Sequence, residues 1–245
     1  MNVYRAIRRG TILRTVAGKE PFYWVDQKPG VVEFGTKFAR WAVDATLLSE
    51  STTLLSVGLG EDVSFETELI NRYGCSVFGF DPTPASRQYI TRSVTDPRFR
   101  TFAYAVADHD GALTFNLPPE ASADLVNASA IADYGTGRST TTTLPCLTLA
   151  GARQLCNIET LDILKLDIEG AEYAVLAQAL ANDWLAGVSQ LLVEFHHFLP
   201  GLGSAQTKHC IAAVRQAGFD IAWIGRTNHE YLFTRAGSVA IQPAD

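Results

Sequence analysis

Two acidic side chains, Asp167 and Glu169, directly follow an apolar run that is typical of a buried strand. Farther along the chain, Glu194 and His196 stand at the end of a second such run. The carboxyl ends of parallel strands meet at one edge of a sheet, so we expect these four side chains to converge. An imidazole with a pKa near neutrality can accept the proton of an alcohol, and a nearby carboxylate can orient it. The pattern predicts acid–base chemistry with His196 as the base and Asp167 and Glu194 as its partners.

Other interpretations of these residues stay open. Asp167, Glu194 and His196 could hold a divalent cation, and an imidazole ligand would favour manganese, iron or zinc over magnesium. Glu169 and Glu172 can simply complement a helix dipole. A histidine here can also be a buried, hydrogen-bonded residue without a chemical role. Because the sequence has no strict ligand motif, we prefer the metal-free interpretation.

A second feature with chemical meaning lies earlier in the chain. The apolar run Leu54–Val57 is followed by Gly58 and Gly60, then by an amphipathic segment and a second apolar run that ends on Asp81. This order predicts a β-α-β unit. Glycines let a ligand approach the backbone at a helix N-terminus, and an acid at the end of the second strand can bond the hydroxyls of a ribose. We therefore predict a nucleoside-binding site.

The turn itself indicates which nucleoside binds. A dinucleotide fingerprint needs a third glycine, but Val63 stands at that position. Glu61 and Asp62 would repel a pyrophosphate, whereas they suit a cofactor that has a ribose, no phosphate and a positive centre. S-adenosylmethionine, a sulfonium cation that carries adenosine, fits this description. The alternatives are a nicotinamide-dependent oxidoreductase, which these features disfavour, and a non-catalytic domain whose glycines only make a tight turn or which binds the cofactor for a partner.

The segments around these features predict further elements. Apolar residues at helical spacing predict a helix over Val31–Glu50. A strand over Phe99–Val106 ends at Ala107 and Asp108, where Asp108 can bond the adenine or merely form a turn. The weakly periodic stretch 118–138 is expected to be mobile without ligand and to border the acceptor.

The alternation of apolar runs with helical segments predicts an α/β fold. We expect a Rossmann-like, mostly parallel sheet with right-handed crossovers and helices on both faces. Two alternating runs, Phe219–Ile224 and Tyr231–Thr234, predict a C-terminal antiparallel hairpin. In this interpretation residues 1–50 form an N-terminal helical extension or cap, and residues 51–245 form the cofactor-binding domain.

The composition of the chain limits the kinds of partner that the protein is expected to bind. The 245-residue chain has a formal net charge of −6 and no run of more than two Lys or Arg residues, which argues against a nucleic-acid partner. The sequence shows no stretch typical of a membrane span or a signal peptide. Its four cysteines form no Cys-x-x-Cys pair, so neither a cysteine-based zinc site nor a disulfide framework is indicated, and we predict a cytoplasmic location. A small molecule or a glycan is the expected acceptor, and a homodimer is compatible with the sequence.

The segment Leu161–Leu176 resembles the signature of the FkbM-type S-adenosylmethionine-dependent methyltransferases. It begins Leu-Asp-Ile-Leu-Lys-Leu-Asp-Ile-Glu-Gly-Ala-Glu, and Gly58–Glu66 and Phe80–Pro82 resemble the methyltransferase-like branch of that group. The resemblance extends over residues 53–235 and implies the seven-stranded methyltransferase fold. Together with the predicted base it suggests O-methylation of a hydroxyl on a small molecule or sugar. The residues that we predict to contact the cofactor are Gly58, Gly60, Glu61, Asp81, Pro82, Ala107, Asp108 and Asp167.

The chain departs from this family's pattern at two places. Many relatives carry an asparagine and a further glycine in the first turn, where this chain has Glu61 and Asp62. They often carry a glutamate at the end of the second strand, where this chain has Asp81. The cofactor contacts therefore carry over, whereas the details of the acceptor do not.

Overall fold

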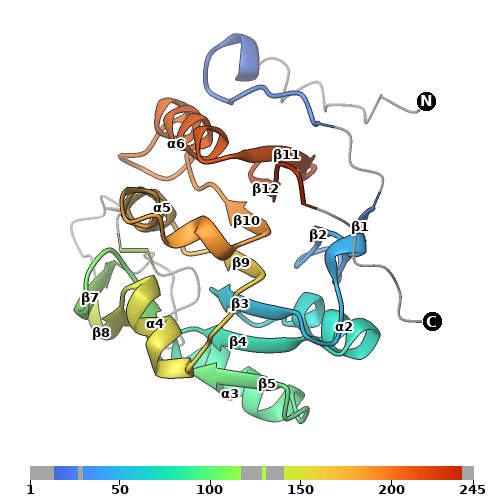
Figure 1. The fold of residues 1–245 in the computed structure, drawn as a ribbon. Coiled ribbons are helices and arrows are strands. Elements are labelled where there is room, and N and C mark those ends of the chain that lie inside the picture. Colours follow the sequence, from blue (N-terminus) through green and yellow to red (C-terminus); the bar gives the residue numbers. More distant parts are fainter. Residues whose placement is uncertain (1–13, 27–29, 117–128, 131–140, 239–245) are drawn as a thin grey trace.

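The computed structural model describes residues 14–26, 30–116, 129–130 and 141–238. These residues form a seven-stranded sheet, a three-stranded sheet, a two-stranded hairpin and the helices that pack on them (Figure 1). The elements in chain order are β1 (Val31–Phe34), β2 (Trp41–Asp44), η1 (Ala45–Leu47), β3 (Thr53–Val57), α2 (Ser64–Tyr73), β4 (Ser76–Phe80), α3 (Pro84–Ser93), β5 (Phe99–Phe102), β6 (Ala105–Val106), β7 (Gly111–Asn116), β8 (Thr141–Leu147), α4 (Leu149–Cys156), β9 (Ile163–Leu166), α5 (Glu172–Ala181), η2 (Trp184–Gly187), β10 (Gln190–Glu194), α6 (Ser204–Gln216), β11 (Phe219–Ile224) and β12 (Glu230–Arg235).

The central sheet has the strand order β11-β12-β10-β9-β3-β4-β5. The five strands from β10 to β5 pair in parallel, and β12 lies antiparallel between β10 and β11. This order confirms the predicted α/β fold and its C-terminal hairpin, with the reversed strand one place in from the edge. The strands that follow β3 in the chain, β4 and β5, lie on one side of it, and the strands that follow β9 lie on the opposite side of the sheet. The boundary between β3 and β9 is therefore the switch point, where open α/β sheets bind their ligands.

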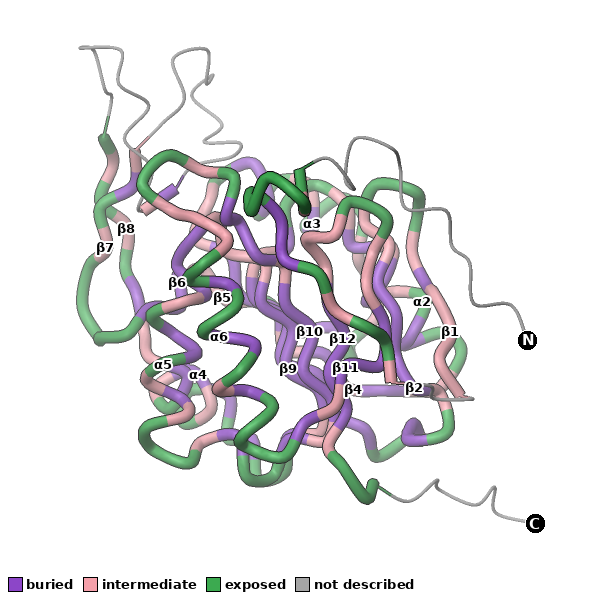
Figure 2. The backbone as a smooth tube through the Cα atoms, turned by 90° about the horizontal axis from the view of Figure 1, so that it is seen from above, coloured by how far each residue is buried: buried purple, intermediate pink, exposed green. Residues whose placement is uncertain are grey.

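Helices cover both faces of this sheet, as predicted (Figure 1). On one face α4, α5 and α6 pack through buried side chains such as Leu149, Val175 and Ile211. On the other face α2 packs together with the β1–β2 hairpin, where Phe65 is completely buried. The strands between the two layers are buried along most of their length (Figure 2). A strand covered on both faces is normally apolar throughout, so the buried Lys165 in β9 is an exception that calls for a reason.

The predicted helix over Val31–Glu50 is wrong. This segment forms the antiparallel hairpin β1–β2 followed by η1. Phe34 pairs with Trp41 across the ladder, and the chain turns at Gly35, which has a φ of +87°. Helical spacing assigned Phe38 to a buried face, but Phe38 is 85% exposed in the hairpin loop.

Tertiary contacts explain why this segment is extended. β2 packs on β10 and β12. The Gln190 side chain on β10 accepts from the Asp44 N–H at 2.7 Å and donates to the Asp44 carbonyl at 3.2 Å. The helical extension predicted for residues 1–50 therefore does not hold for residues 31–44, whereas residues 1–13 and 27–29 lie outside the described residues.

A small sheet, β6-β8-β7, stands beside the central one. The predicted single strand Phe99–Val106 is divided between β5 of the central sheet and β6 of this small sheet. Ser129 pairs with Asn116 at the end of β7, and its hydroxyl donates to the Glu169 carbonyl. The rest of the stretch 118–138, for which mobility was predicted, lies outside the described residues.

Candidate active site

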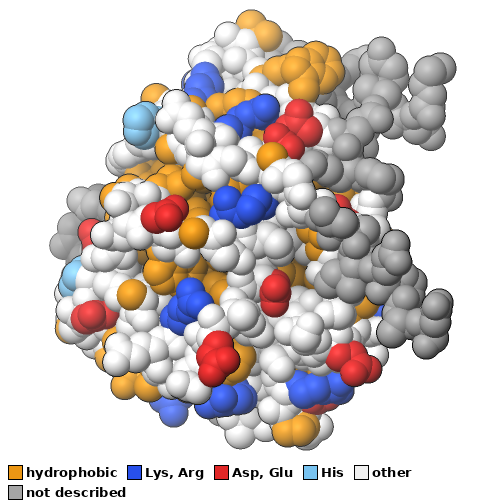
Figure 3. Space-filling view, viewed as in Figure 1, with side chains coloured by type: hydrophobic (Ala, Val, Ile, Leu, Met, Phe, Trp, Pro, Cys, Tyr) orange, Lys and Arg blue, Asp and Glu red, His pale blue; other side chains and the backbone are white. Residues whose placement is uncertain are grey.

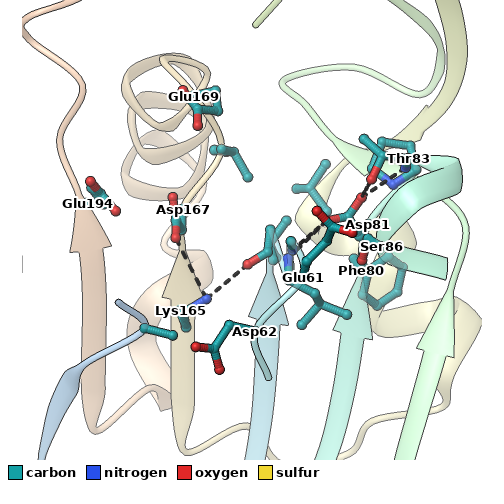
Figure 4. A pocket seen from close by; sticks show the side chains of 18 of the residues that line it. Glu61, Asp62, Phe80, Asp81, Thr83, Ser86, Lys165, Asp167, Glu169 and Glu194 are labelled. Atoms are coloured by element: carbon teal, nitrogen blue, oxygen red, sulfur yellow. Dashed lines mark hydrogen bonds and ion pairs between the residues drawn. The ribbon is translucent and has the colours of Figure 1, made fainter. Parts of the chain in front are cut away.

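A cavity of about 510 Å³ lies over the carboxyl ends of β3, β4, β9 and β10 (Figure 4). It occupies the switch point of the sheet, and the β1–β2 loop, β6 and β7 complete its wall. The volume falls within the range of small-molecule and cofactor pockets. Both of the chemically interesting segments of the sequence meet here, so this cavity is the candidate active site.

The turn after β3 presents backbone to the cavity. Gly58 has a φ of +81°, and a Cβ atom on it would lie 1.7 Å from the Asp167 carbonyl oxygen. Only glycine therefore fits at the point where β3 and β9 end side by side. Gly60 has a φ of +56°, and a Cβ atom there would meet nothing within 4 Å. The close approach of a ligand to the backbone, which the sequence predicts, is therefore available at Gly60, while Gly58 is required by packing within the chain.

Asp81, predicted to hold the ribose, organises the turn itself. Its Oδ2 accepts from the N–H groups of Leu59 and Gly60, both at 3.0 Å. Its Oδ1 accepts from the N–H of Thr83 at 2.8 Å and from the Thr83 hydroxyl at 2.6 Å. A carboxylate has about four lone-pair positions, so this chain uses all of them. Asp81 fixes the cofactor turn, and a ribose hydroxyl would have to replace one of these four donors.

The other predicted cofactor residues divide into two groups. Glu61 and Pro82 line the cavity, whereas Ala107 and Asp108 do not. Asp108 is exposed, and its carboxylate lies 2.8 Å from Nδ1 of the neighbouring His109. This arrangement gives the predicted contact of Asp108 with adenine no support.

Lys165 has a larger part in the site than the sequence indicated. Its ammonium donates to the Gly58 carbonyl at 2.9 Å, and it lies 3.6 Å from Glu66 and 4.0 Å from Asp167 (Figure 4). Glu66 in turn accepts from the Ser56 hydroxyl at 2.6 Å. The buried lysine thereby joins the cofactor turn to the acidic end of β9. A single lysine within an apolar strand was the sequence signal for this role.

Acidic side chains dominate the cavity wall. Eight acids line the cavity, namely Glu61, Asp62, Glu66, Asp81, Asp167, Glu169, Glu194 and Glu230. The lining bases are Arg40 and Lys165. Such an excess favours a ligand with a positive centre and opposes a pyrophosphate. The wall therefore fits the sulfonium of S-adenosylmethionine and disfavours the nicotinamide alternative.

The acids of β9 and β10 converge on His196, as predicted. His196 Nε2 lies 3.8 Å from Asp167, 3.7 Å from Glu169 and 4.0 Å from Glu194. On the other side of the ring, Nδ1 lies 3.3 Å from Glu172, which also accepts from the His196 N–H at 2.8 Å. The three acids around Nε2 line the cavity, but His196 lies behind them and is buried.

The protonation of this cluster differs from the one that the sequence suggested. Burial alone would lower the pKa of His196, but the hydrogen bond to Glu172 and the surrounding carboxylates outweigh it and raise the pKa to about 10. Burial raises the pKa of Glu194 well above that of an ordinary glutamate, and Asp167 raises it further. Burial also raises the pKa of Glu169.

A cationic His196 changes the chemistry of the site. An imidazolium has no lone pair, so this arrangement does not favour His196 as the proton acceptor at neutral pH. The ligand atoms of Asp167, Glu194 and His196 lie within 4.8 Å of one another, as the alternative of a metal site requires. Protonation of His196 competes with a metal here, because the imidazolium already balances the carboxylates. The geometry makes His196 the counter-ion of the cluster and leaves a carboxylate to accept a proton.

Comparison with known families identifies the chain. The model of the FkbM methyltransferase domain matches residues 54–221, which include the cofactor turn, the acidic end of β9 and β10. The chain belongs to this methyltransferase family, and its cofactor is S-adenosylmethionine. Both predictions from the sequence are thereby confirmed.

Two solved structures are similar to this one. Fibrillarin from Methanococcus jannaschii, a pre-rRNA processing protein, matches 78% of this chain and 69% of its own at 9% identity and a TM-score of 0.43. Fibrillarin from Aeropyrum pernix, solved with natively bound S-adenosyl-L-methionine, matches 89% of this chain and 86% of its own at 10% identity and a TM-score of 0.45. Among curated proteins, no match is found.

Proposed function

We propose that this protein transfers the methyl group of S-adenosylmethionine to a hydroxyl oxygen of a small molecule or glycan. The observation that carries the proposal is the group of carboxylates Asp167, Glu169 and Glu194 beside the cofactor turn, with the buried His196 behind them. A hydroxyl must lose its proton as it is methylated, so a site that holds a proton acceptor next to the methyl donor suits an alcohol.

Different residues of the chain bind the cofactor and accept the proton of the hydroxyl. S-adenosylmethionine supplies, when bound, a methyl group that its sulfonium activates for in-line displacement. Asp81 holds the turn against which the nucleoside lies, and the acidic wall favours the positive charge. Glu194 accepts the hydroxyl proton at a carboxylate oxygen, because it lines the cavity, its side chain is 24% exposed and burial raises its pKa. His196 keeps the carboxylates close together by balancing their charge.

The same wall restricts the acceptor. An excess of carboxylates opposes a phosphorylated or carboxylated molecule, so we propose a neutral or cationic acceptor. Phe38 of the β1–β2 hairpin loop lines the cavity and is 85% exposed, so it offers an apolar face to such a molecule. A nucleic-acid partner is not part of the proposal, because basic and acidic side chains are interspersed on the face seen in Figure 3. A homodimer stays a prediction.

Features outside the cavity agree with a reducing compartment. All four cysteines, Cys75, Cys146, Cys156 and Cys210, are free and buried. Among the described helices, none combines the length and the apolar character that crossing a membrane requires. We therefore keep a cytoplasmic location as part of the proposal.

Transfer to oxygen can be tested with a panel of acceptors. We expect neutral or amino sugars and polyols to release S-adenosylhomocysteine from S-adenosylmethionine, and their phosphorylated counterparts to release none. Mass spectrometry and NMR of the product locate the methyl group on an oxygen. A methyl group on nitrogen or carbon would contradict the proposal, and tight cofactor binding without transfer to any acceptor would favour the non-catalytic alternative.

The role of Asp81 gives a prediction for cofactor affinity. Asp81→Asn replaces an acceptor of the turn with an amide donor, so we expect S-adenosylhomocysteine to bind about 1.5–3 kcal/mol more weakly. Calorimetry measures this change, and circular dichroism checks that the variant is folded. Asp108→Asn is the matched comparison, because Asp108 is exposed and outside the cavity. Wild-type affinity in Asp81→Asn would refute the assignment, and a loss in Asp108→Asn would support the adenine contact predicted from the sequence.

A further inference from the structure

A second group of histidines lies on the other side of the end of β10. His197 follows His196 but contacts Glu20 of the N-terminal segment and His229 of the turn between β11 and β12. Each of these three residues offers one ligand atom, and these atoms lie within 4.8 Å of one another. None of the three lines the active-site cavity.

The chain leaves this group incompletely satisfied. His197 Nε2 lies 2.7 Å from Oε2 of Glu20, and both side chains are buried. His197 Nδ1 is also buried, and no hydrogen-bond partner for it is found among the described residues. A buried polar nitrogen without a partner costs about 1–3 kcal/mol. Such a group calls for an explanation, and a bound ion is one.

The fold holds His229 directly beside His197. The rings of His197 and His229 lie 5.0 Å apart at 85°. The Phe195 N–H donates to the His229 carbonyl at 2.9 Å, which fixes the turn beside the end of β10. The two imidazoles are thereby fixed beside Glu20, with their ligand atoms close enough together to share one ion.

We propose that Glu20, His197 and His229 form a site for a divalent transition-metal ion of the zinc class. Two imidazoles and one carboxylate are the donors that zinc prefers, with a water in the fourth position, whereas magnesium and calcium prefer oxygen donors alone. Zinc lies about 2.1 Å from such donors, so any two of them can be at most about 4.2 Å apart. Small movements of the side chains therefore close the site.

His196, on the far side of the end of β10, and Arg14 are both cations close enough to oppose a metal ion at this place. The Arg14 guanidinium donates to Oε1 of Glu20 at 2.8 Å. This contact leaves Oε2 of Glu20 as the ligand atom. The bound ion would join the segment of residues 14–26 to the end of the central sheet.

Titration of the full, untagged protein with zinc chloride tests this site. After treatment with a chelator, calorimetry should show one zinc ion per chain, and magnesium chloride should give no signal. His229→Gln should weaken zinc binding at least about tenfold, since even the loss of an outer-shell partner of a metal has this effect. His209→Gln should change nothing, because His209 is exposed on α6.

Two further variants keep the test decisive. Circular dichroism and the affinity for S-adenosylhomocysteine show whether the His229→Gln variant is folded. If it is not, the Glu20→Gln variant is used in its place and should show the same loss of zinc binding. Glu194→Gln should leave zinc binding unchanged, because Glu194 belongs to the other cluster. The proposal is overturned by the absence of zinc binding, by equal binding in His229→Gln and His209→Gln, or by loss of binding in Glu194→Gln alone.

Discussion

Glu194→Gln is expected to lower turnover about a hundredfold or more while leaving the affinity for S-adenosylhomocysteine unchanged. The substitution keeps the shape of the side chain but removes the carboxylate that accepts the hydroxyl proton. A hundredfold loss corresponds to about 2.7 kcal/mol in activation free energy. S-adenosylhomocysteine is the proper ligand for the binding measurement, because its sulfur is uncharged and does not respond to the loss of a nearby negative charge.

The pH profile gives this prediction a second readout. A proton acceptor must be ionised, so the turnover rate should fall as the pH falls through the pKa of Glu194. Burial and Asp167 raise this pKa, which places the acidic limb of the profile well above the value of 4.5 for an ordinary glutamate. Glu230→Gln is the matched control, since Glu230 lines the same cavity and carries the same charge. Equal losses in the two variants would show that charge alone matters, and full activity in Glu194→Gln would remove Glu194 from the mechanism.

Local patterns in the sequence were sufficient for the central sheet and for the location of the site. β3, β4, β9 and β10 can be recognised as apolar runs that end in glycine or an acid. Parallel strands that are buried on both faces consist mostly of apolar residues, so such runs indicate them. The alternation of these runs with helical segments fixes the connections. The residues at the strand ends, Gly58, Asp81, Asp167 and Glu194, therefore had to meet at the switch point.

The β1–β2 hairpin could not be predicted in the same way. Phe34, Phe38 and Trp41 fit a helical period and also fit a hairpin whose turn lies between them. The choice between the two depends on β10 and β12, against which β2 packs. Gln190, the residue that bonds the backbone of Asp44, is 146 positions away in the chain.

The ionisation of the site also depends on contacts between residues that are far apart in the chain. The sequence shows that His196 follows an acid, but it does not show that Glu172, 24 residues earlier, lies against the ring. Only the folded geometry reveals that four carboxylates surround the imidazole. The same holds for Asp81, whose carboxylate could have faced either a ligand or the turn.

Glu172 is the residue whose loss should destabilise the protein most. It is completely buried, and its two oxygens accept from the N–H groups of Gly170 and His196, both at 2.8 Å. Oε1 also lies 3.3 Å from His196 Nδ1. Removing Glu172 takes away the carboxylate beside His196 Nδ1 and leaves two N–H groups without their acceptor. Breaking a buried ion pair in this way costs about 3–5 kcal/mol. Glu172→Ala should lower the free energy of unfolding by this amount.

Denaturant and thermal unfolding measure this effect. For a domain of this size the expected loss corresponds to a fall in Tm of roughly 6–20 °C. Glu159→Ala removes an exposed glutamate and should change the free energy of unfolding by less than about 0.5 kcal/mol. Glu172→Gln should fall between the two, because an amide oxygen still accepts a hydrogen bond but carries no charge. The turn at Glu169, which has a φ of +51°, depends on the bond between Glu172 and Gly170, so Glu172→Ala should also lower turnover. A loss of stability below about 1 kcal/mol in Glu172→Ala would mean that His196 is neutral in the folded protein and that the ion pair proposed here does not form.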